Sequence, residues 1–162
     1  MRFTIRDYRP EDFDTLWLID QSCFAPGIAY THYELRTYMR RPRAFTLVAQ
    51  SEDARSAPNT LILGFVVAES SRRGTGHVIT IDVRTAARRL RVGSALLNAA
   101  EAHLLAEKCA SVHLETAVDN ISAQSFYKRQ GYDVAGRIRQ YYSNGVDALV
   151  LEKQLISAKT AS

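Results

Sequence analysis

The sequence predicts a single mixed α/β domain with a mostly antiparallel sheet, and three observations support this fold class. Residues 77–116 read as strand, basic loop, helix and strand, the order of a right-handed βαβ crossover between two parallel strands. Apolar and β-branched runs at both ends of the chain are separated by turn residues, as in antiparallel hairpins. A length of 162 residues, with 46% hydrophobic and 23% charged residues, suits one domain with one core, expected over residues 1–156.

The chain is expected to begin with a strand and a helix. Residues 3–6 alternate apolar and polar side chains, and the segment 9–12 places proline and acidic residues as at a helix start, so a helix should run to about Cys23. Its two faces differ in polarity. Apolar side chains should face the core (Phe13, Leu16, Trp17), and acidic side chains should face water (Asp12, Asp14, Asp20).

A loop and a second helix are expected next. Residues 24–30, FAPGIAY, break the helical period with proline and glycine and expose apolar side chains, a composition typical of binding loops. Thr31 and Glu34 then match a capping box, which predicts a helix to about residue 40.

The middle of the chain reads as β-structure. Residues 44–50 and 61–69 should form a hairpin with a polar tip at 51–59. The glycine-rich turn 71–76 should lead into a central strand, residues 77–83.

After the helix that follows the basic loop and ends near Lys108, residues 111–116 should form another strand. A short helix, 121–130, is closed by Gly131 in the usual position just past a helix end. The last two strands, 132–142 and 148–153, should pair as a hairpin, because Asn144-Gly145 is a strong hairpin signal. The tail after Ile156 is expected to fray. The whole order is β α α β β β α β α β β.

Composition excludes several classes of protein. Cys23 and Cys109 are the only cysteines and have no C-x-x-C partner, so neither a zinc site nor a disulfide framework is indicated. No apolar run is long enough to span a bilayer and the first residues lack the apolar core of a signal peptide, so a cytoplasmic protein without membrane contact is expected. The net charge of +4 lies in short groups of arginines, which favours a small polyanionic ligand over nucleic acid.

The strongest such group lies in the basic loop that precedes the helix beginning near Val92. A helix start presents unpaired N–H groups and partial positive charge, so this loop is suited to a phosphorylated ligand. Gly93 would let the backbone approach that ligand, and Ser94 could donate a hydrogen bond. No G-x-G-x-x-G or P-loop motif is present, which disfavours a dinucleotide or a triphosphate. The alternative is a solvated cationic loop in an ordinary crossover.

Two motifs carry a resemblance to a known family. Residues 88–97, RRLRVGSALL, resemble the acyl-coenzyme A pyrophosphate loop of the GNAT acetyltransferase superfamily, Arg/Gln-x-x-Gly-x-Gly/Ala. Arg91 occupies the middle glycine slot, and Ala86 stands where the family often has proline. Residues 114–142 resemble a second family motif, N-x-x-[AS]-x-x-[FL]-Y-x-x-x-G-[FY]. Its matching residues are Asn120, Ala123, Phe126, Tyr127, Gly131 and Tyr132.

The resemblance extends over residues 2–155 and implies the GNAT fold. That fold has a twisted sheet of about seven strands, about four helices on both faces, and a parallel pair, here 77–83 and 111–116, splayed apart at one end. It also implies acetyl-coenzyme A as cofactor. The residues expected to bind it are Ile81, Asp82, Val83, Arg88, Arg89, Leu90, Arg91, Val92, Gly93, Ser94, Asn120, Ser122 and Tyr127.

The resemblance further implies roles in acetyl transfer. Tyr127 takes the position of the general acid that protonates the leaving thiolate, while Glu115 and His77 are the candidates for the base that deprotonates the amine. A carboxylate on a central strand is costly to bury without a purpose, which favours Glu115. The remaining histidines have no partner near them in sequence that raises them above surface or core roles (His32, His103, His113).

The acceptor is expected to be the N-terminal α-amine of a protein or peptide. Residues 139–142, RQYY, and the loop 24–30 resemble the peptide-binding segments of ribosomal-protein N-terminal acetyltransferases, with Phe24, Tyr30, Tyr141 and Tyr142 as substrate-binding residues. Two alternatives stay open: a small-molecule amine as acceptor, or a non-catalytic acyl-coenzyme A or nucleic-acid binding module. A monomer and a homodimer are both compatible with the sequence.

Overall fold

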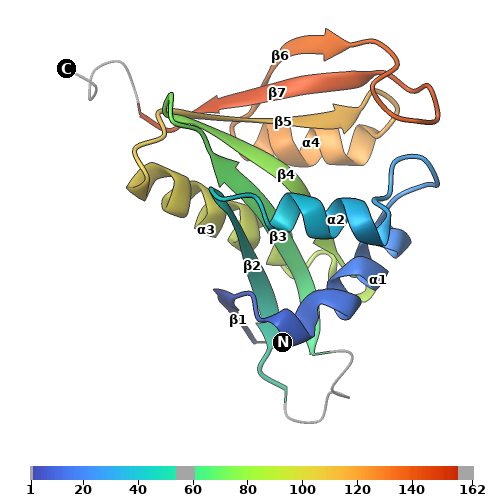
Figure 1. Cartoon of the computed structure of the whole chain (residues 1–162), viewed down its shortest axis with the longest axis vertical. Helices are drawn as coiled ribbons and strands as arrows, with labels where there is room; N and C mark the ends of the chain where they lie inside the picture. The colour runs from blue at the N-terminus through green and yellow to red at the C-terminus, as the bar shows by residue number, and fades with distance from the viewer. Residues whose placement is uncertain (1, 54–60, 157–162) are drawn as a thin grey trace.

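The computed structural model describes residues 2–53 and 61–156, and the predicted order of elements is confirmed (Figure 1). The strands are β1 (Phe3–Asp7), β2 (Ala44–Ser51), β3 (Ile62–Ser70), β4 (Thr75–Val83), β5 (Ser111–Ala117), β6 (Asp133–Ile138) and β7 (Ala148–Gln154). The α-helices are α1 (Phe13–Cys23), α2 (His32–Met39), α3 (Val92–Ala106) and α4 (Ile121–Arg129). Most of the expected polar tip at 51–59 and the expected frayed tail lie outside the described residues.

All seven strands lie in one sheet in the order β1-β2-β3-β4-β5-β7-β6. Every neighbouring pair is antiparallel except β4 and β5, which are parallel. Their pairing covers only residues 75–77 of β4 and 111–113 of β5, and beyond it the two strands diverge (Figure 1). The splayed parallel pair is therefore confirmed. Residues 78–83 and 114–117 turn unpaired backbone edges toward the opening.

The helices cover both faces of the sheet, and each face has its own core. Helices α3 and α4 pack on one face through side chains such as Leu96, Leu104 and Tyr127. Helices α1 and α2 pack on the other face through side chains such as Leu16 and Leu35. The pairing of β4 with β3 shifts by one residue after Val78, because Ile79 has no partner in the register. The side chains of Thr80 and Asp82 therefore point toward α1. Side chains on the two faces of β4 thus lie in different surroundings, one face against α3 and the other against α1.

Local signals explain where helices begin and end. Thr31 Oγ1 accepts the Glu34 N–H at 3.1 Å and Glu34 Oε1 accepts the Thr31 N–H at 3.0 Å, so the predicted capping box forms at the start of α2. Gly131 follows α4 with φ +94°, a conformation that favours glycine. Within the described residues, no helix is both long and apolar enough to cross a bilayer.

Two sequence predictions about polar residues and a strand end are wrong. Asp12 and Asp20 were expected in water but are buried, Asp12 in a bidentate ion pair with Arg6 at 2.8 and 2.9 Å. The last two strands pair antiparallel as expected, but the first of them does not reach residue 142, because β6 ends at Ile138 and residues 139–147 form a longer loop. Asp147 draws the base of that loop together by accepting the Gln140 N–H at 2.8 Å.

Candidate active site

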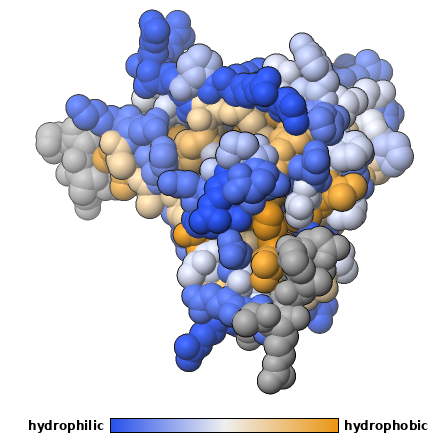
Figure 2. All heavy atoms as spheres, turned by 60° about the horizontal axis from the view of Figure 1, so that its bottom comes forward, coloured by the Kyte–Doolittle hydropathy of each residue, from blue (hydrophilic) through white to orange (hydrophobic). Residues whose placement is uncertain are grey.

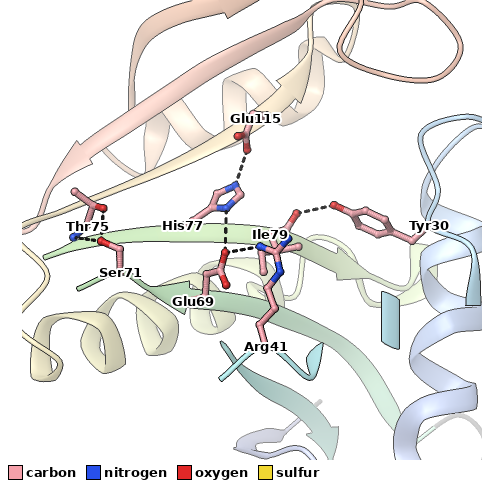
Figure 3. Close-up of polar contacts among 8 residues, drawn as sticks. All are labelled: Tyr30, Arg41, Glu69, Ser71, Thr75, His77, Ile79 and Glu115. Carbon is pink, nitrogen blue, oxygen red and sulfur yellow. Dashed lines mark hydrogen bonds and ion pairs between the residues drawn. The ribbon is translucent and has the colours of Figure 1, made fainter. Parts of the chain in front are cut away.

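Two of the predicted catalytic residues form one unit at the point where the sheet opens. His77 is the last residue of β4 paired with β5, and Glu115 lies two residues past the paired part of β5. His77 Nε2 lies 2.7 Å from Glu115 Oε2, a hydrogen bond between side chains that are 23% and 15% exposed (Figure 3). The sequence offered them as competing bases, whereas the structure joins them into a pair that can share a proton and still reach solvent.

A second carboxylate lies on the other side of the imidazole. Glu69 on β3 pairs across the sheet with His77, and its Oε1 lies 4.0 Å from His77 Nδ1 (Figure 3). Arg41, just past α2, holds the same carboxylate oxygen at 2.8 Å. The result is a row of polar contacts across three strands, from Arg41 through Glu69 and His77 to Glu115. This row fixes the plane and tilt of the imidazole ring.

His113, for which only a surface or core role was expected, lies in contact with this unit. Its ring stacks on that of His77, with centroids 4.5 Å apart and planes 4° from parallel. Burial lowers the pKa of His113, and the neighbouring His77 lowers it further, which favours a neutral ring.

The same residues offer three possible metal ligands, His77, His113 and Glu115, with atoms that lie within 4.8 Å of one another. Stacked, nearly parallel rings direct their nitrogen lone pairs along parallel planes and not toward one point. The observed geometry therefore fits a proton relay better than a metal centre.

Tyr127 lies on α4, in the core on the face of the sheet that α3 covers. Its side chain is buried against Phe126 and Tyr132, and among the described residues its hydroxyl makes no hydrogen bond. Burial raises the pKa of Tyr127 well above its usual value, and the charges of Asp82 and Tyr142 raise it further. The hydroxyl is therefore a proton-bearing group that is free to donate a hydrogen bond at neutral pH.

The expected coenzyme loop connects β4 to α3. Arg88, Arg89, Leu90 and Arg91 are exposed, and the N–H groups of Val92, Gly93 and Ser94 begin the helix. These features supply positive charge and free donors for a pyrophosphate. Arg91 has φ +63°, so the backbone keeps the left-handed shape that glycine usually provides in this slot.

Several expected coenzyme residues also have structural partners. Ser94 Oγ accepts from Gln130 Nε2 at 3.0 Å, which leaves its own O–H free to donate. Asn120 Oδ1 caps α4 by accepting the Ala123 N–H at 3.2 Å and the Ser122 hydroxyl at 3.3 Å. Ile81 and Val83 face α3, whereas the Asp82 side chain faces α1. Asp82 can therefore serve the coenzyme only through its backbone.

The two segments expected to hold the acceptor are far apart in sequence but in contact. Ser143 donates its hydroxyl to the Gly27 carbonyl at 2.7 Å and its N–H to the same oxygen at 3.2 Å. We call residues 24–31 the acceptor segment. It is tied to the sheet by the Tyr30 hydroxyl, which donates to the Ile79 carbonyl at 3.3 Å (Figure 3).

The tyrosines of these segments are not equally accessible. Tyr141 is 45% exposed and its ring meets that of half-buried Tyr142 edge to face, with centroids 5.0 Å apart. Tyr30 and Phe24 are also half-buried, and the Tyr30 ring lies 5.2 Å from that of Tyr38. A space-filling view shows apolar residues in a recess bordered by hydrophilic ones (Figure 2).

Sequence reasoning missed Glu69, Arg41 and His113. Glu69 could have been found, because counting across the turn at 71–74 places it opposite His77. His113 could not, because the register of two parallel strands joined by a long crossover is not set by any local signal.

Comparison with known proteins finds similar acetyltransferases. An uncharacterised N-acetyltransferase of Methanocaldococcus jannaschii is 34% identical over 122 residues, which are 63% of this chain and 78% of that relative. An N-alpha-acetyltransferase of Sulfurisphaera tokodaii is 37% identical over 81 residues, which are 49% of this chain and 48% of that relative. A chain in the crystal structure of the NatC complex bound to Gag peptide and CoA shares the fold. Its TM-score is 0.80 at 20% identity, over 95% of this chain and 99% of that one.

The molecule is thus an enzyme of the acetyltransferase class that uses acetyl-coenzyme A. More narrowly, residues 11–132 match the model of the acetyltransferase (GNAT) family, and the chain belongs to that family.

Proposed function

We propose that this enzyme acetylates the N-terminal α-amine of a protein or peptide, by direct attack of the amine in a ternary complex. The observation that carries the proposal is the His77–Glu115 pair, partly exposed at the opening of the sheet on the same face as the acceptor segment. N-terminal acetylation by the relative from Sulfurisphaera tokodaii, which its name states, supports the choice of acceptor.

In this proposal Glu115 takes the proton of the acceptor ammonium, directly or through a water, and His77 shares it. Glu69 and Arg41 hold the imidazole in place from the other side. An α-amine has a pKa of about 7.7 to 8.0, against about 10.4 for a lysine side chain, so a carboxylate relay suits the α-amine better at neutral pH.

Acetyl-coenzyme A supplies an activated acyl thioester, and the residues of the chain fit it. The unpaired edge of β4 offers backbone groups to its arm, and the loop 88–94 offers cations and free N–H groups to its phosphates. Tyr127 then donates its hydroxyl hydrogen toward the sulfur as negative charge develops there. Asn120 and Ser122 lie at the start of α4 beside this path.

The acceptor peptide would lie between the acceptor segment and the loop 139–147. Tyrosine hydroxyls can bond the backbone of an extended peptide while their rings cover its first side chain, roles proposed for Tyr30, Tyr141 and Tyr142. Phe24 would border the same channel. Burial raises the pKa of Tyr141 to about 12, so its hydroxyl stays a donor at neutral pH.

The test is acetyl transfer by the wild type and the Glu115→Gln variant, measured as thiol release over pH 6 to 9. The acceptors are peptides with a free N-terminus, the same peptides with a blocked N-terminus and an internal lysine, and small amines. We expect the free N-terminus to be preferred. Glu115→Gln should lower kcat/KM most at low pH and recover in part as the free amine becomes available.

Three results would contradict parts of this proposal. An equal loss at every pH would assign Glu115 to substrate positioning. Equal use of lysine side chains would remove the N-terminus from the claim, and turnover confined to small amines would replace the acceptor class. The matched control is Glu11→Gln, an exposed carboxylate just before α1 that lies on no strand of the site and should leave the pH profile unchanged.

A further inference from the structure

Two aspartates lie buried face to face between α1 and β4. Asp20 on α1 and Asp82 on β4 are 0% and 1% exposed. Each uses one oxygen: Asp20 Oδ2 accepts the Tyr30 N–H at 2.8 Å, and Asp82 Oδ1 accepts the Thr80 hydroxyl at 2.7 Å. The other two oxygens, Asp20 Oδ1 and Asp82 Oδ2, are buried without a donor among the described residues, and the two carboxyl groups lie within hydrogen-bonding reach of each other.

The pair lacks a neutralising cation in the part of the chain that the structure describes. Within residues 2–53 and 61–156, no lysine, arginine or histidine forms an ion pair with either carboxyl group. The titratable groups that face the pair are acids or weak acids from every element around it: Glu34 of α2, Cys23 of α1, Tyr30 of the acceptor segment and Tyr127 of α4.

Burial is the largest cause that raises the pKa of both aspartates, and for Asp82 the neighbouring Asp20 adds to it. Two facing carboxylates in such a site would repel each other at close range, with no water to screen them. One proton held between the two unpaired oxygens removes the repulsion and gives both atoms a partner.

The pair also connects the acceptor segment to β4, the strand expected to bind the coenzyme. Asp20 holds the backbone of Tyr30, and the hydroxyl of Tyr30 reaches the Ile79 carbonyl on β4. Asp82 lies on that same strand, whose open edge faces the coenzyme slot. The acceptor segment is therefore fastened to β4 at two points, and the carboxyl pair is one of them.

We propose that Asp20 and Asp82 share one proton and act as a positioning pair that holds the acceptor segment against β4, so that loss of this proton weakens acceptor binding. The inference rests on the acceptor site proposed above, and it adds a pH-dependent control of that site. The proton-sharing pair touches neither substrate directly. Its single charge also helps to keep Tyr127 protonated.

The first experiment compares KM and kcat for the best acceptor from pH 5 to 10 in wild type, Asp82→Asn and Asp82→Ala. The side-chain amide introduced by Asp82→Asn can donate permanently to Asp20, so the ratio of the KM of this variant to that of wild type should fall as pH rises. Asp82→Ala leaves the Asp20 carboxylate without that partner and should raise KM by about tenfold, the scale of one lost buried hydrogen bond. Asp14→Asn, an exposed aspartate of α1, should follow wild type.

The second experiment needs no acceptor and no activity. A carboxyl pair whose folded pKa is raised binds more protons in the folded state, so it stabilises the fold at low pH and this contribution is lost as pH rises through the raised pKa. Thermal unfolding should therefore show wild type losing stability relative to Asp82→Asn as pH rises above about 4, the usual aspartate value.

Parallel curves of stability against pH for wild type and Asp82→Asn would contradict the proposal of a shared proton, even if Asp82→Ala failed to fold. A constant ratio of the two KM values across the pH range would overturn the link to acceptor binding. Failure of the proposed function gives a different result, namely no peptide turnover while the two stability curves still converge toward low pH.

Discussion

Tyr127 has surroundings that hold its proton in place. The ring is buried, and the nearby charge of the Asp20–Asp82 pair adds to the cost of forming a tyrosinate. A tyrosine of this kind stabilises a developing thiolate by donating a hydrogen bond and does not need to ionise beforehand. This behaviour is what a group facing a leaving sulfur requires.

We therefore expect Tyr127→Phe to lower kcat by about 10² to 10⁴, the usual contribution of a positioned acid, while calorimetry shows nearly unchanged affinity for coenzyme A. Tyr132→Phe is the matched control, because Tyr132 is equally buried but donates its hydroxyl to Glu101 at 2.8 Å. It should lose stability and keep kcat. Wild-type turnover by Tyr127→Phe would reduce Tyr127 to a packing residue.

The sequence allowed candidate residues to be recognised by residue type and position, but it did not show which side chains contact one another. Motif and strand position singled out Glu115, His77 and Tyr127, but their contacts depend on how β4 and β5 are aligned. The burial of Asp20 was mispredicted because its residue type was given more weight than the helical period, which places it four residues after Leu16 and seven after Phe13 on the core face. Only the tertiary structure shows that this face is covered by Asp82 and by the acceptor segment.

Among the elements, the loop between β4 and α3 combines two conflicting demands. Arg89 and Arg91 have φ +69° and +63°, where a side chain causes strain that glycine avoids. Both are exposed cations at the start of a helix, where an anionic ligand gains from their charge. The loop therefore combines backbone strain with a positive charge that would attract the phosphates of the proposed ligand.

Arg91→Gly tests the backbone strain and the positive charge separately. It should raise the free energy of unfolding by about 1 kcal/mol, because glycine adopts a positive φ without strain. It should also weaken coenzyme A binding at low salt, because a cation is lost. Arg91→Ala loses the same charge but keeps a Cβ, so it should bind as weakly without the gain in stability. Equal unfolding curves for the two variants would mean that position 91 carries no backbone strain.

Elements with strong local signals were correctly predicted. The capping box of α2, the glycine after α4 and the βαβ crossover all appear as expected. The last two strands pair as expected, but β6 ends earlier than predicted because side-chain contacts compete with strand pairing beside the Asn-Gly turn. Asp147 binds both Arg137 and the Gln140 backbone, and Ser143 bonds to the acceptor segment, which together favour a longer loop.

On the scale of the whole molecule, the sheet consists of two parts that are joined by only a short stretch of strand pairing. Strands β1 to β4 form one part and β5, β7 and β6 the other, joined by the short parallel pairing at residues 75–77 and 111–113. The expected coenzyme loop and α3 belong to the chain that connects them. A ligand in the opening would touch both parts.

Coenzyme A should therefore stabilise the whole fold. At 100 times its dissociation constant, a ligand that binds only the folded state adds about 2.7 kcal/mol. For a chain of this size that is a rise of several degrees in Tm, readable by thermal unfolding. The rise should shrink with added salt, and pantetheine, which lacks the phosphates, should produce much less of it. No shift at millimolar coenzyme A would contradict the assignment of the slot.

The short pairing of β4 and β5 also affects self-association. An unpaired strand edge invites another chain to add a strand, and proteins usually cover, charge or shorten such edges. Here the open edges of residues 78–83 and 114–117 lie inside the sheet and point at each other across a widening gap. A flat strand could reach one of them but could not pair with both along their length. The divergence that would admit the narrow, flexible arm of the proposed coenzyme thereby makes the same opening a poor template for aggregation.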